Sequence, residues 1–298
     1  MRYFHSFVII AATFAAGTVM AAEAAGDTDV AMQKTAFAPT GAKTSVALGS
    51  GSGTLVFTAP PRESEEEGKE IYGPVAEYLS KAIGRKVEYR YPGTWGIYRT
   101  GMLKGDYDLI FDGPHFCSYR TEKLGHAVLV KIPATLEFSI IVRKDSKYTA
   151  TQQLAGHQMC SHAPPNLGAL VMLNQYDNPV RQPAIHPVKG WDEVYNGVQT
   201  GMCDGGVIPT VQLKKFDKKG EMRVLFQSSK IPNQAFSAGP RVSHEEQAKI
   251  AQALLAPEAT GPTAKLRGAF KVGDHFVAAN NQEYNGLAEY LRNEWGYY

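Results

Sequence analysis

The sequence predicts an α/β protein of two lobes with a ligand cleft between them, and three features support that prediction. Short apolar runs alternate with amphipathic stretches from residue 54 onwards, an order that implies mostly parallel sheets with helices on their faces. The alternation starts again near residue 136 without obvious repetition of sequence. The chain later returns through an extended segment at 235–242, so strands are expected to cross between the lobes. Ligands of such sheets bind at the carboxyl ends of the strands, which places the expected cleft between the lobes.

The first lobe is expected to begin with a β-α-β-α-β run. Its first helix has apolar residues at helical spacing, and Gly84 is suited to end it. Ser64 and Glu67 form the pattern of a capping box at its start. The expected strands are 55–58, 86–91 and 107–111, and the expected helices are 67–83 and 94–104.

The second lobe repeats this order, and two helices close the chain. Ser243 and Glu246 predict another capping box, at the start of the first closing helix. Hinge segments at 134–136 and 233–236 should let the lobes close on a ligand. The expected strands are 136–142, 157–161, 184–188, 205–208 and 223–226, and the expected helices are 166–175, 191–200, 210–218, 245–255 and 282–294.

The N-terminus has the pattern of a secretory signal peptide. Arg2 precedes an apolar run from Phe7 to Ala16, and small residues suited to signal peptidase follow. This run is shorter than the ~20 residues that span a bilayer, which argues against a membrane anchor. We therefore expect a periplasmic protein. The expected parts are a signal peptide at 1–21, a flexible Ala/Gly/Thr/Ser-rich tether at 22–53, lobe one at 54–135 plus 235–298, and lobe two at 136–234.

The composition argues against several functional classes. A net charge of +2, without a clustered basic excess, does not suggest a nucleic-acid binder. The histidines lack the close spacing of metal ligands, so no metal or cofactor is expected. Ser161 and His162 are neighbours on a predicted strand, and the chain has no Gly-x-Ser-x-Gly elbow. We therefore expect no catalytic residues and no enzymatic activity.

The three cysteines, Cys117, Cys160 and Cys203, are expected to be free thiols. Export permits disulfides, but an odd count leaves at least one thiol unpaired. Cys160 ends one predicted strand, and Cys203 starts another that should run parallel to it. An extended strand would hold the two sulfur atoms too far apart to bond.

Four segments together resemble the phosphate/phosphite/phosphonate-type periplasmic binding proteins of ABC transporters. Phe57–Pro61 resembles the first strand and its loop of that family, and Tyr72–Leu79 resembles its P-L-A-x-Y-L helix. Tyr107–Pro114 is similar to its D-x-A-x-x-G-P strand, and Gly201–Val207 to its G-x-V-D-A-G-A-V segment. The resemblance covers roughly residues 54 to 270. No single motif is decisive, and the order and spacing of the four carry the resemblance.

The resemblance implies a type II periplasmic binding fold and a solute-binding function. A protein of this kind closes like a clamshell on a small molecule and delivers it to inner-membrane transporter components. A monomer is expected. Two other classes stay open: a sensor subunit with the same binding lobes, and a hydrolase or transferase of similar build. No assembled acid–base–nucleophile set supports the enzyme.

The chain departs from the family pattern where the anion would bind. The family's Ser-Thr-Ser-Gly run at a helix start corresponds here to Pro165-Asn166-Leu167-Gly168, so the three hydroxyls are missing. A family tyrosine corresponds to Trp95, and the family's His-Glu pair to Trp191-Asp192. Phosphate and simple phosphonates should therefore bind weakly, and a larger, partly apolar molecule should bind better. A hydrophobic ligand such as a sterol or another lipid is the alternative.

The candidate ligand-binding residues lie on the loops that follow the predicted strands. His115 is interpreted either as a ligand contact or as a loop histidine bonded to backbone. Ser64 caps a helix, and Arg62 can still pair with an anionic group. Trp95 is favoured as a stacking partner over a core position. The full set is Pro61, Arg62, Glu63, Trp95, Tyr98, Phe111, Asp112, Pro114, His115, Phe116, His162, Pro165, Asn166, Leu167, Trp191, Asp192 and Ile208.

Overall fold

A computed structural model describes residues 53–270, 273, 275–294 and 296–297 of the chain. All of them belong to one compact unit, Ala47–Tyr298. The expected signal peptide and all but the last residue of the expected tether lie outside the described residues. Among the described helices, none has both the length and the apolar character needed to cross a membrane.

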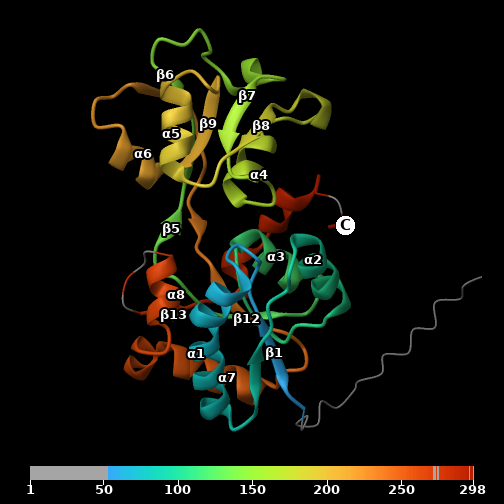
Figure 1. Ribbon diagram of the computed structural model, residues 1–298. Coiled ribbons are helices and arrows are strands. Elements are labelled where there is room, and N and C mark those ends of the chain that lie inside the picture. Colours follow the sequence, from blue (N-terminus) through green and yellow to red (C-terminus); the bar gives the residue numbers. More distant parts are fainter. Residues whose placement is uncertain (1–52, 271–272, 274, 295, 298) are drawn as a thin grey trace, which may run out of the picture. The chain divides into compact units, whose positions relative to one another are not determined.

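The first sheet has six strands in the order β13-β4-β12-β3-β1-β2 (Figure 1). β1 runs parallel to β2 and β3, whereas β12 runs antiparallel to β3 and β4 because it returns from the other lobe. The strands are β1 Leu55–Thr58, β2 Val87–Tyr89, β3 Leu109–Asp112, β4 Ala127–Lys131, β12 Ala235–Ala238 and β13 Val277–Ala278. The helices of this lobe are α1 Glu65–Ile83, α2 Trp95–Lys104, α3 Pro114–Lys123, α7 His244–Leu255 and α8 Ala264–Ala269.

Strand alternation divides the core of this lobe into two layers. Leu55 and Phe57 of β1 point into the cluster that α1, α7 and α8 cover, and Val56 between them points into the cluster under α2 and α3. α1 begins at the predicted capping box, in which the Ser64 hydroxyl accepts from the backbone N–H of Glu67. The sequence pattern thus places α1 within two residues of its observed start.

The second sheet has five strands in the order β10-β6-β9-β7-β8. β8, β7 and β9 are parallel, and β6 and β10 add antiparallel pairs. Both sheets are therefore mixed, because the strands that enter and leave each lobe run against its βαβ units. The elements are β6 Phe138–Arg143, β7 Gln158–Ser161, β8 Ala184–Pro187, β9 Gly205–Pro209, β10 Met222–Gln227, α4 Leu167–Leu173, α5 Trp191–Gln199 and α6 Thr210–Phe216, with 3-10 turns at Thr151–Leu154 and Pro179–Arg181.

Two short strands join the lobes. β5 Thr135–Leu136 pairs antiparallel with β11 Ile231–Pro232, and Figure 1 shows β5 between the two sheets. β5 lies in the first predicted hinge segment, and β11 ends directly before the second.

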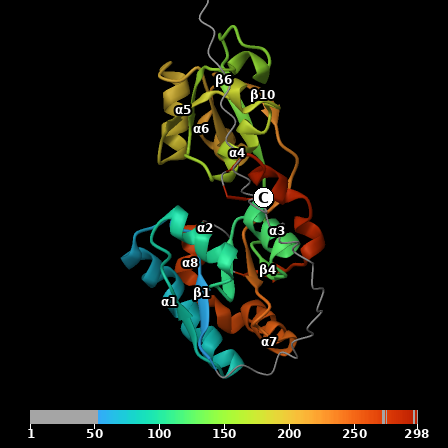
Figure 2. The same cartoon turned by 90° about the vertical axis from the view of Figure 1, so that its right-hand side faces the viewer.

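Two predicted regions differ from the structure. Pro114, His115 and Phe116, expected in a loop after a predicted strand, instead form the first turn of α3. The helix expected at 282–294 is wrong. Two 3-10 turns, Asn281–Tyr284 and Leu287–Leu291, replace it because Gly286 between them takes a left-handed φ of 80°. In Figure 2 the C-terminal segment, in red, lies beside α3 and α4, and the amide of Asn174 donates to the carbonyl of Tyr290 at 3.1 Å.

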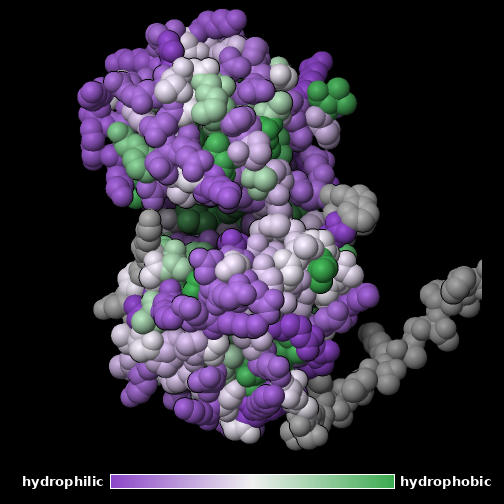
Figure 3. Space-filling model, viewed as in Figure 1, coloured by the Kyte–Doolittle hydropathy of each residue, from purple (hydrophilic) through white to green (hydrophobic). Residues whose placement is uncertain are grey.

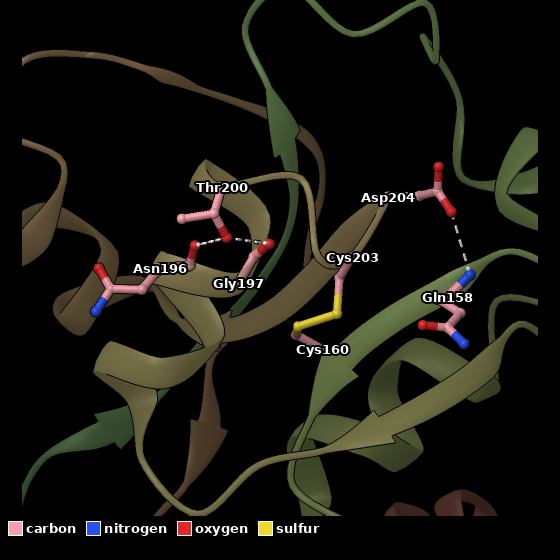
Figure 4. Close-up of a disulfide and its surroundings, with 7 residues drawn as sticks. All are labelled: Gln158, Cys160, Asn196, Gly197, Thr200, Cys203 and Asp204. Atoms are coloured by element: carbon pink, nitrogen blue, oxygen red, sulfur yellow. Dashed lines mark hydrogen bonds between the residues drawn. A yellow bond between two sulfur atoms is a disulfide. The ribbon is translucent and has the colours of Figure 1, made fainter.

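The prediction of three free thiols is also wrong, because Cys160 and Cys203 form a disulfide (Figure 4). The chain before β9 is a turn and not an extended strand: the N–H of Cys203 donates to Gly197 of α5, and Asp204 pairs with Gln158 of β7. This turn brings the two Cα atoms to 5.6 Å. Gly197 is needed there, since a Cβ at that position would lie 2.5 Å from the Cys160 sulfur. Cys117 is free and buried.

Candidate functional site

The carboxyl ends of strands from the two lobes meet at a contact between His115 and Pro165. In lobe one, β1 leads into the loop of Arg62, and β3 leads through Gly113 into α3. In lobe two, β7 leads into the loop 162–166 before α4. His115 Nε2 lies 3.1 Å from the carbonyl oxygen of Pro165, which joins the two ends. The structure thus brings together residues that the sequence places 50 positions apart.

A positive pole forms on the lobe-one side, around the start of α3. Gly113 is the N-cap and supplies no side-chain cap, so the first turn keeps backbone N–H groups free of that partner. The guanidinium of Arg62 lies beside this turn: a Cβ built on Gly113 would lie 3.7 Å from Arg62 Nη2. The same Cβ would lie only 2.9 Å from the His115 ring. A side chain at position 113 would therefore crowd the His115 ring, so this position requires glycine, which the sequence reasoning did not identify.

His115 is 3% exposed and packs against the Phe116 ring at 4.1 Å between centroids. Its Nδ1 atom is buried and has no hydrogen-bond partner among the described residues. Burial is the main cause that lowers the pKa of His115 to about 3, and the nearby Arg62 acts in the same direction. His115 is therefore neutral at physiological pH and lies on a helix, not in a loop.

A buried network of charged and polar side chains connects the end of β3 to α2 and α3. The Asp112 carboxylate accepts from the hydroxyl of Tyr98, from Arg120 Nε at 3.2 Å and from the N–H of Gly113 at 2.8 Å. Arg120 also donates to the Tyr98 hydroxyl at 2.8 Å. Tyr98, Asp112 and Arg120 are all fully buried. The polar atoms of Tyr98 and Asp112 are thus engaged in hydrogen bonds within this network and do not face a ligand. Arg120 is the member of the network that the sequence reasoning missed.

A second buried polar group lies under the Arg62 loop. Burial raises the pKa of the half-buried Glu63 carboxyl, against the lowering effect of Arg62. The hydroxyl of Tyr72, on α1, is fully buried near the Glu63 carboxyl, whose pKa it helps to lower, and the Tyr72 ring stacks on Tyr89 at 5.1 Å. Tyr72 was not singled out from the sequence as a site residue, because its position fits the apolar face of a helix.

The lobe-two side offers rings and few donors. His162 stacks on Trp191 at 4.0 Å between centroids, and its Nε2 is buried without a partner among the described residues. The side-chain oxygen of Asn166 accepts from Gly168 N–H at 2.9 Å, which caps α4. At the start of α5, the exposed Asp192 lies against Gly190, and its carboxylate disfavours an anion there.

The remaining candidates are mostly core residues. Trp95 is half-buried and stacks on the buried Phe116 at 6.1 Å between centroids. Phe111 is fully buried in the other layer of lobe one. Pro61 and Pro165 are partly exposed, whereas Pro114, Leu167 and Ile208 are buried. Figure 3 shows a hollow between the two lobes with hydrophobic residues inside it.

The described residues give no support to metal binding or nucleophilic catalysis. No group of three or more His, Cys, Asp and Glu side chains among them is arranged to hold a metal ion. The hydroxyl of Ser161 donates to the backbone carbonyl of His162 at 2.8 Å rather than to its ring. Two cavities, of about 440 and 370 Å³, lie elsewhere on lobe one, next to Arg90 and Asp106. Their lining includes none of the predicted site residues.

The chain is similar to known binding proteins in sequence and in fold. It is 22% identical to the phosphate-import protein PhnD of Mycolicibacterium smegmatis, over 67% of this chain and 71% of that protein. PhnD1 of Prochlorococcus marinus, in complex with methylphosphonate, has a TM-score of 0.58 at 14% identity, over 81% of this chain and 98% of that one. XAC2383 of Xanthomonas citri, bound to ATP, has a TM-score of 0.61 at 14% identity, over 80% and 96%.

These structures confirm the two-lobed type II periplasmic binding fold that the sequence predicts. Residues 57–284 match the family described as ABC transporter, phosphonate, periplasmic substrate-binding protein. That span is most of the chain, and it contains Arg62, Gly113, His115 and the loop of Pro165. The chain therefore belongs to the family of periplasmic substrate-binding proteins of phosphonate-type ABC transporters.

Proposed function

We propose that this protein, exported through a cleaved signal peptide, captures a small molecule between its lobes in the periplasm and delivers it to the membrane components of an importer. Family membership supports the transport role. The observation that carries the location of the site is the contact between His115 and Pro165, because it joins the strand ends of the two lobes next to Arg62. We expect a monomer to perform this role.

The proposed ligand has one oxyanion group and a larger planar or apolar part. Arg62 and the first turn of α3 supply charge and N–H donors for the oxyanion. The stacked pair of His162 and Trp191, together with the half-buried Trp95, offers ring surfaces for the rest. Lobe two lacks the three hydroxyl side chains of the family's Ser-Thr-Ser-Gly segment. A simple anion would therefore be bound mainly by lobe one.

The names of the relatives are compatible with this ligand class. M. smegmatis PhnD is named for phosphate, P. marinus PhnD1 is in complex with methylphosphonate, and X. citri XAC2383 is bound to ATP, which combines a planar base with phosphates. The sterol or lipid alternative gains no support from these relatives. A sensor role uses the same binding lobes and differs only in the membrane partner.

Calorimetry with a matched ligand pair tests the proposal. Phenylphosphonate and methylphosphonate share the anion and differ by an apolar ring. At roughly 25 cal/mol per Å² of buried apolar surface, the ring should tighten binding about tenfold or more. Arg62→Gln should weaken both ligands about tenfold, and Trp191→Ala should weaken phenylphosphonate alone. Arg181→Gln, an exposed arginine of the 3-10 turn in lobe two, is the control. Submicromolar methylphosphonate binding that is indifferent to Arg62→Gln would refute the proposed site.

A further inference from the structure

The position of the proton on His115 follows from its one polar contact. Nε2 lies 3.1 Å from the Pro165 carbonyl oxygen, and a carbonyl oxygen can only accept a hydrogen bond. Nε2 must therefore carry the proton and donate it. A neutral imidazole has a single N–H, so Nδ1 presents a lone pair. Burial and the charge of Arg62 keep the ring neutral, as its lowered pKa indicates.

Nδ1 is thus a buried acceptor without a donor among the described residues. It lies beside the position that the missing side chain of Gly113 leaves unfilled: a Cβ on Gly113 would lie 3.2 Å from Nδ1 and 3.7 Å from Arg62 Nη2. The Arg62 side chain is exposed, so its guanidinium is free to reorient towards a bound anion. An unpaired buried acceptor costs free energy, which a ligand donor in this space would recover.

We infer that His115 selects for a ligand that carries an O–H or N–H donor next to its oxyanion, and that it selects against a fully deprotonated oxyanion. This inference rests on the proposed function. The groups around the space have complementary roles: Arg62 and the first turn of α3 donate to the anionic oxygens, and His115 Nδ1 accepts from the remaining proton. A sulfate ion has the same tetrahedral shape but no proton, so its oxygen would face the Nδ1 lone pair and be repelled.

Inorganic phosphate and sulfate are the probes, since phosphate keeps at least one O–H at neutral pH and sulfate keeps none. Calorimetry of the full chain at pH 7, with titration into the millimolar range, should give phosphate at least tenfold tighter binding than sulfate. His115→Gln keeps a donor that can reach Pro165 but removes the acceptor at the Nδ1 position. It should lower phosphate affinity about tenfold to a hundredfold, the range for one charge-assisted hydrogen bond, and bring the phosphate-to-sulfate ratio near one.

His115→Asn is the matched variant, because its side-chain oxygen can occupy the Nδ1 position while the contact to Pro165 is lost. It should keep most of the preference for phosphate. ¹⁵N NMR of the ligand-free protein supplies an independent readout: the His115 Nδ1 resonance should be that of an unprotonated nitrogen and should shift on addition of phosphate but not of sulfate. A proton on Nδ1 at pH 7 would overturn the inference even if no ligand binds.

The outcomes separate this inference from the proposed function. Equal binding of phosphate and sulfate that Arg62→Gln still weakens would refute the role of His115 and leave the site in place. Binding that Arg62→Gln does not affect would refute the site itself. Unchanged selectivity in His115→Gln, with folding verified by circular dichroism, would also overturn the inference.

Discussion

Different interactions stabilise the part of the candidate site that each lobe contributes. Behind the start of α3, lobe one uses a fully buried ion pair between Asp112 and Arg120, completed by the Tyr98 hydroxyl. Behind the loop of His162, lobe two uses a covalent bond between Cys160 and Cys203. A buried ion pair needs every partner in place, whereas a disulfide acts largely by restricting the unfolded chain. The lobes should therefore respond differently to mutation, reductant and acid.

The largest effect should come from Arg120→Met. This change leaves the Asp112 carboxylate buried without its cation, and breaking a buried pair typically costs about 3–5 kcal/mol. Urea unfolding followed by circular dichroism measures the loss. Lys69→Ala, which removes an exposed and solvent-screened pair with Glu65, is the control and should have a much smaller effect. Equal losses for the two variants would show that the network does not support α3.

Loss of the disulfide should cost somewhat less and should act in lobe two. Cys160 and Cys203 are 43 residues apart, and closing a loop of that size typically contributes about 2–4 kcal/mol. Reductant, or the double change of both cysteines to serine, should lower the melting temperature, and reductant should not affect the double variant further. Thiol titration of the denatured protein should find one reactive thiol before reduction. Three thiols before reduction would contradict the disulfide.

The disulfide also shows where sequence reasoning stops. Local signals placed α1 and α7, because the capping boxes at Ser64 and Ser243 are complete within four residues. The approach of Cys203 to Cys160 depends instead on a turn packed against α5, which is a tertiary feature. α3 was missed since its first residues follow a strand directly and it buries polar residues beside apolar ones, so the sequence shows no amphipathic pattern there.

The candidate site likewise has features that the sequence predicts and features that only tertiary packing determines. Arg62, His115 and Asn166 were predicted to follow strand ends, and they do follow β1, β3 and β7, although His115 lies in a helix and not in a loop. The sequence could not show that Tyr98 of α2 and Asp112 at the end of β3 turn inward to Arg120, because only packing fixes the direction of these side chains. Nor could it show that the Tyr72 hydroxyl is buried near Glu63, because Tyr72 lies on the mostly apolar face of α1.

Acid should act on lobe one, where two histidines are buried. Burial lowers the pKa of both His115 and His126 to about 3. The unfolded chain binds protons on these residues below about pH 6.5, and the folded chain does not until near pH 3. Stability is therefore complete above pH 6.5 and falls as the pH is lowered towards 3, by at most about 1.4 kcal/mol per pH unit for each histidine.

Chemical unfolding at a series of pH values measures this slope. His126→Asn should flatten it, because the substitution removes one of the two buried groups that take up a proton on unfolding. A slope that His126→Asn does not alter would mean that its charge is not excluded in the folded state.

The smallest effect is expected on the radius of gyration when the two lobes close on a ligand. This measurement tests whether the lobes move relative to one another. The lobes are joined by β5 and β11, strands of two residues each, and such short crossings can act as hinges. Small-angle scattering should show a slightly smaller radius of gyration with phenylphosphonate than without it. The change should be small, because the contact between His115 and Pro165 already joins the lobes without ligand. His115→Asn removes that contact and should enlarge the ligand-free radius, so that the decrease on binding becomes larger. An unchanged radius, alongside binding seen by calorimetry, would argue that the ligand enters a preformed site and that the crossing strands do not act as a hinge.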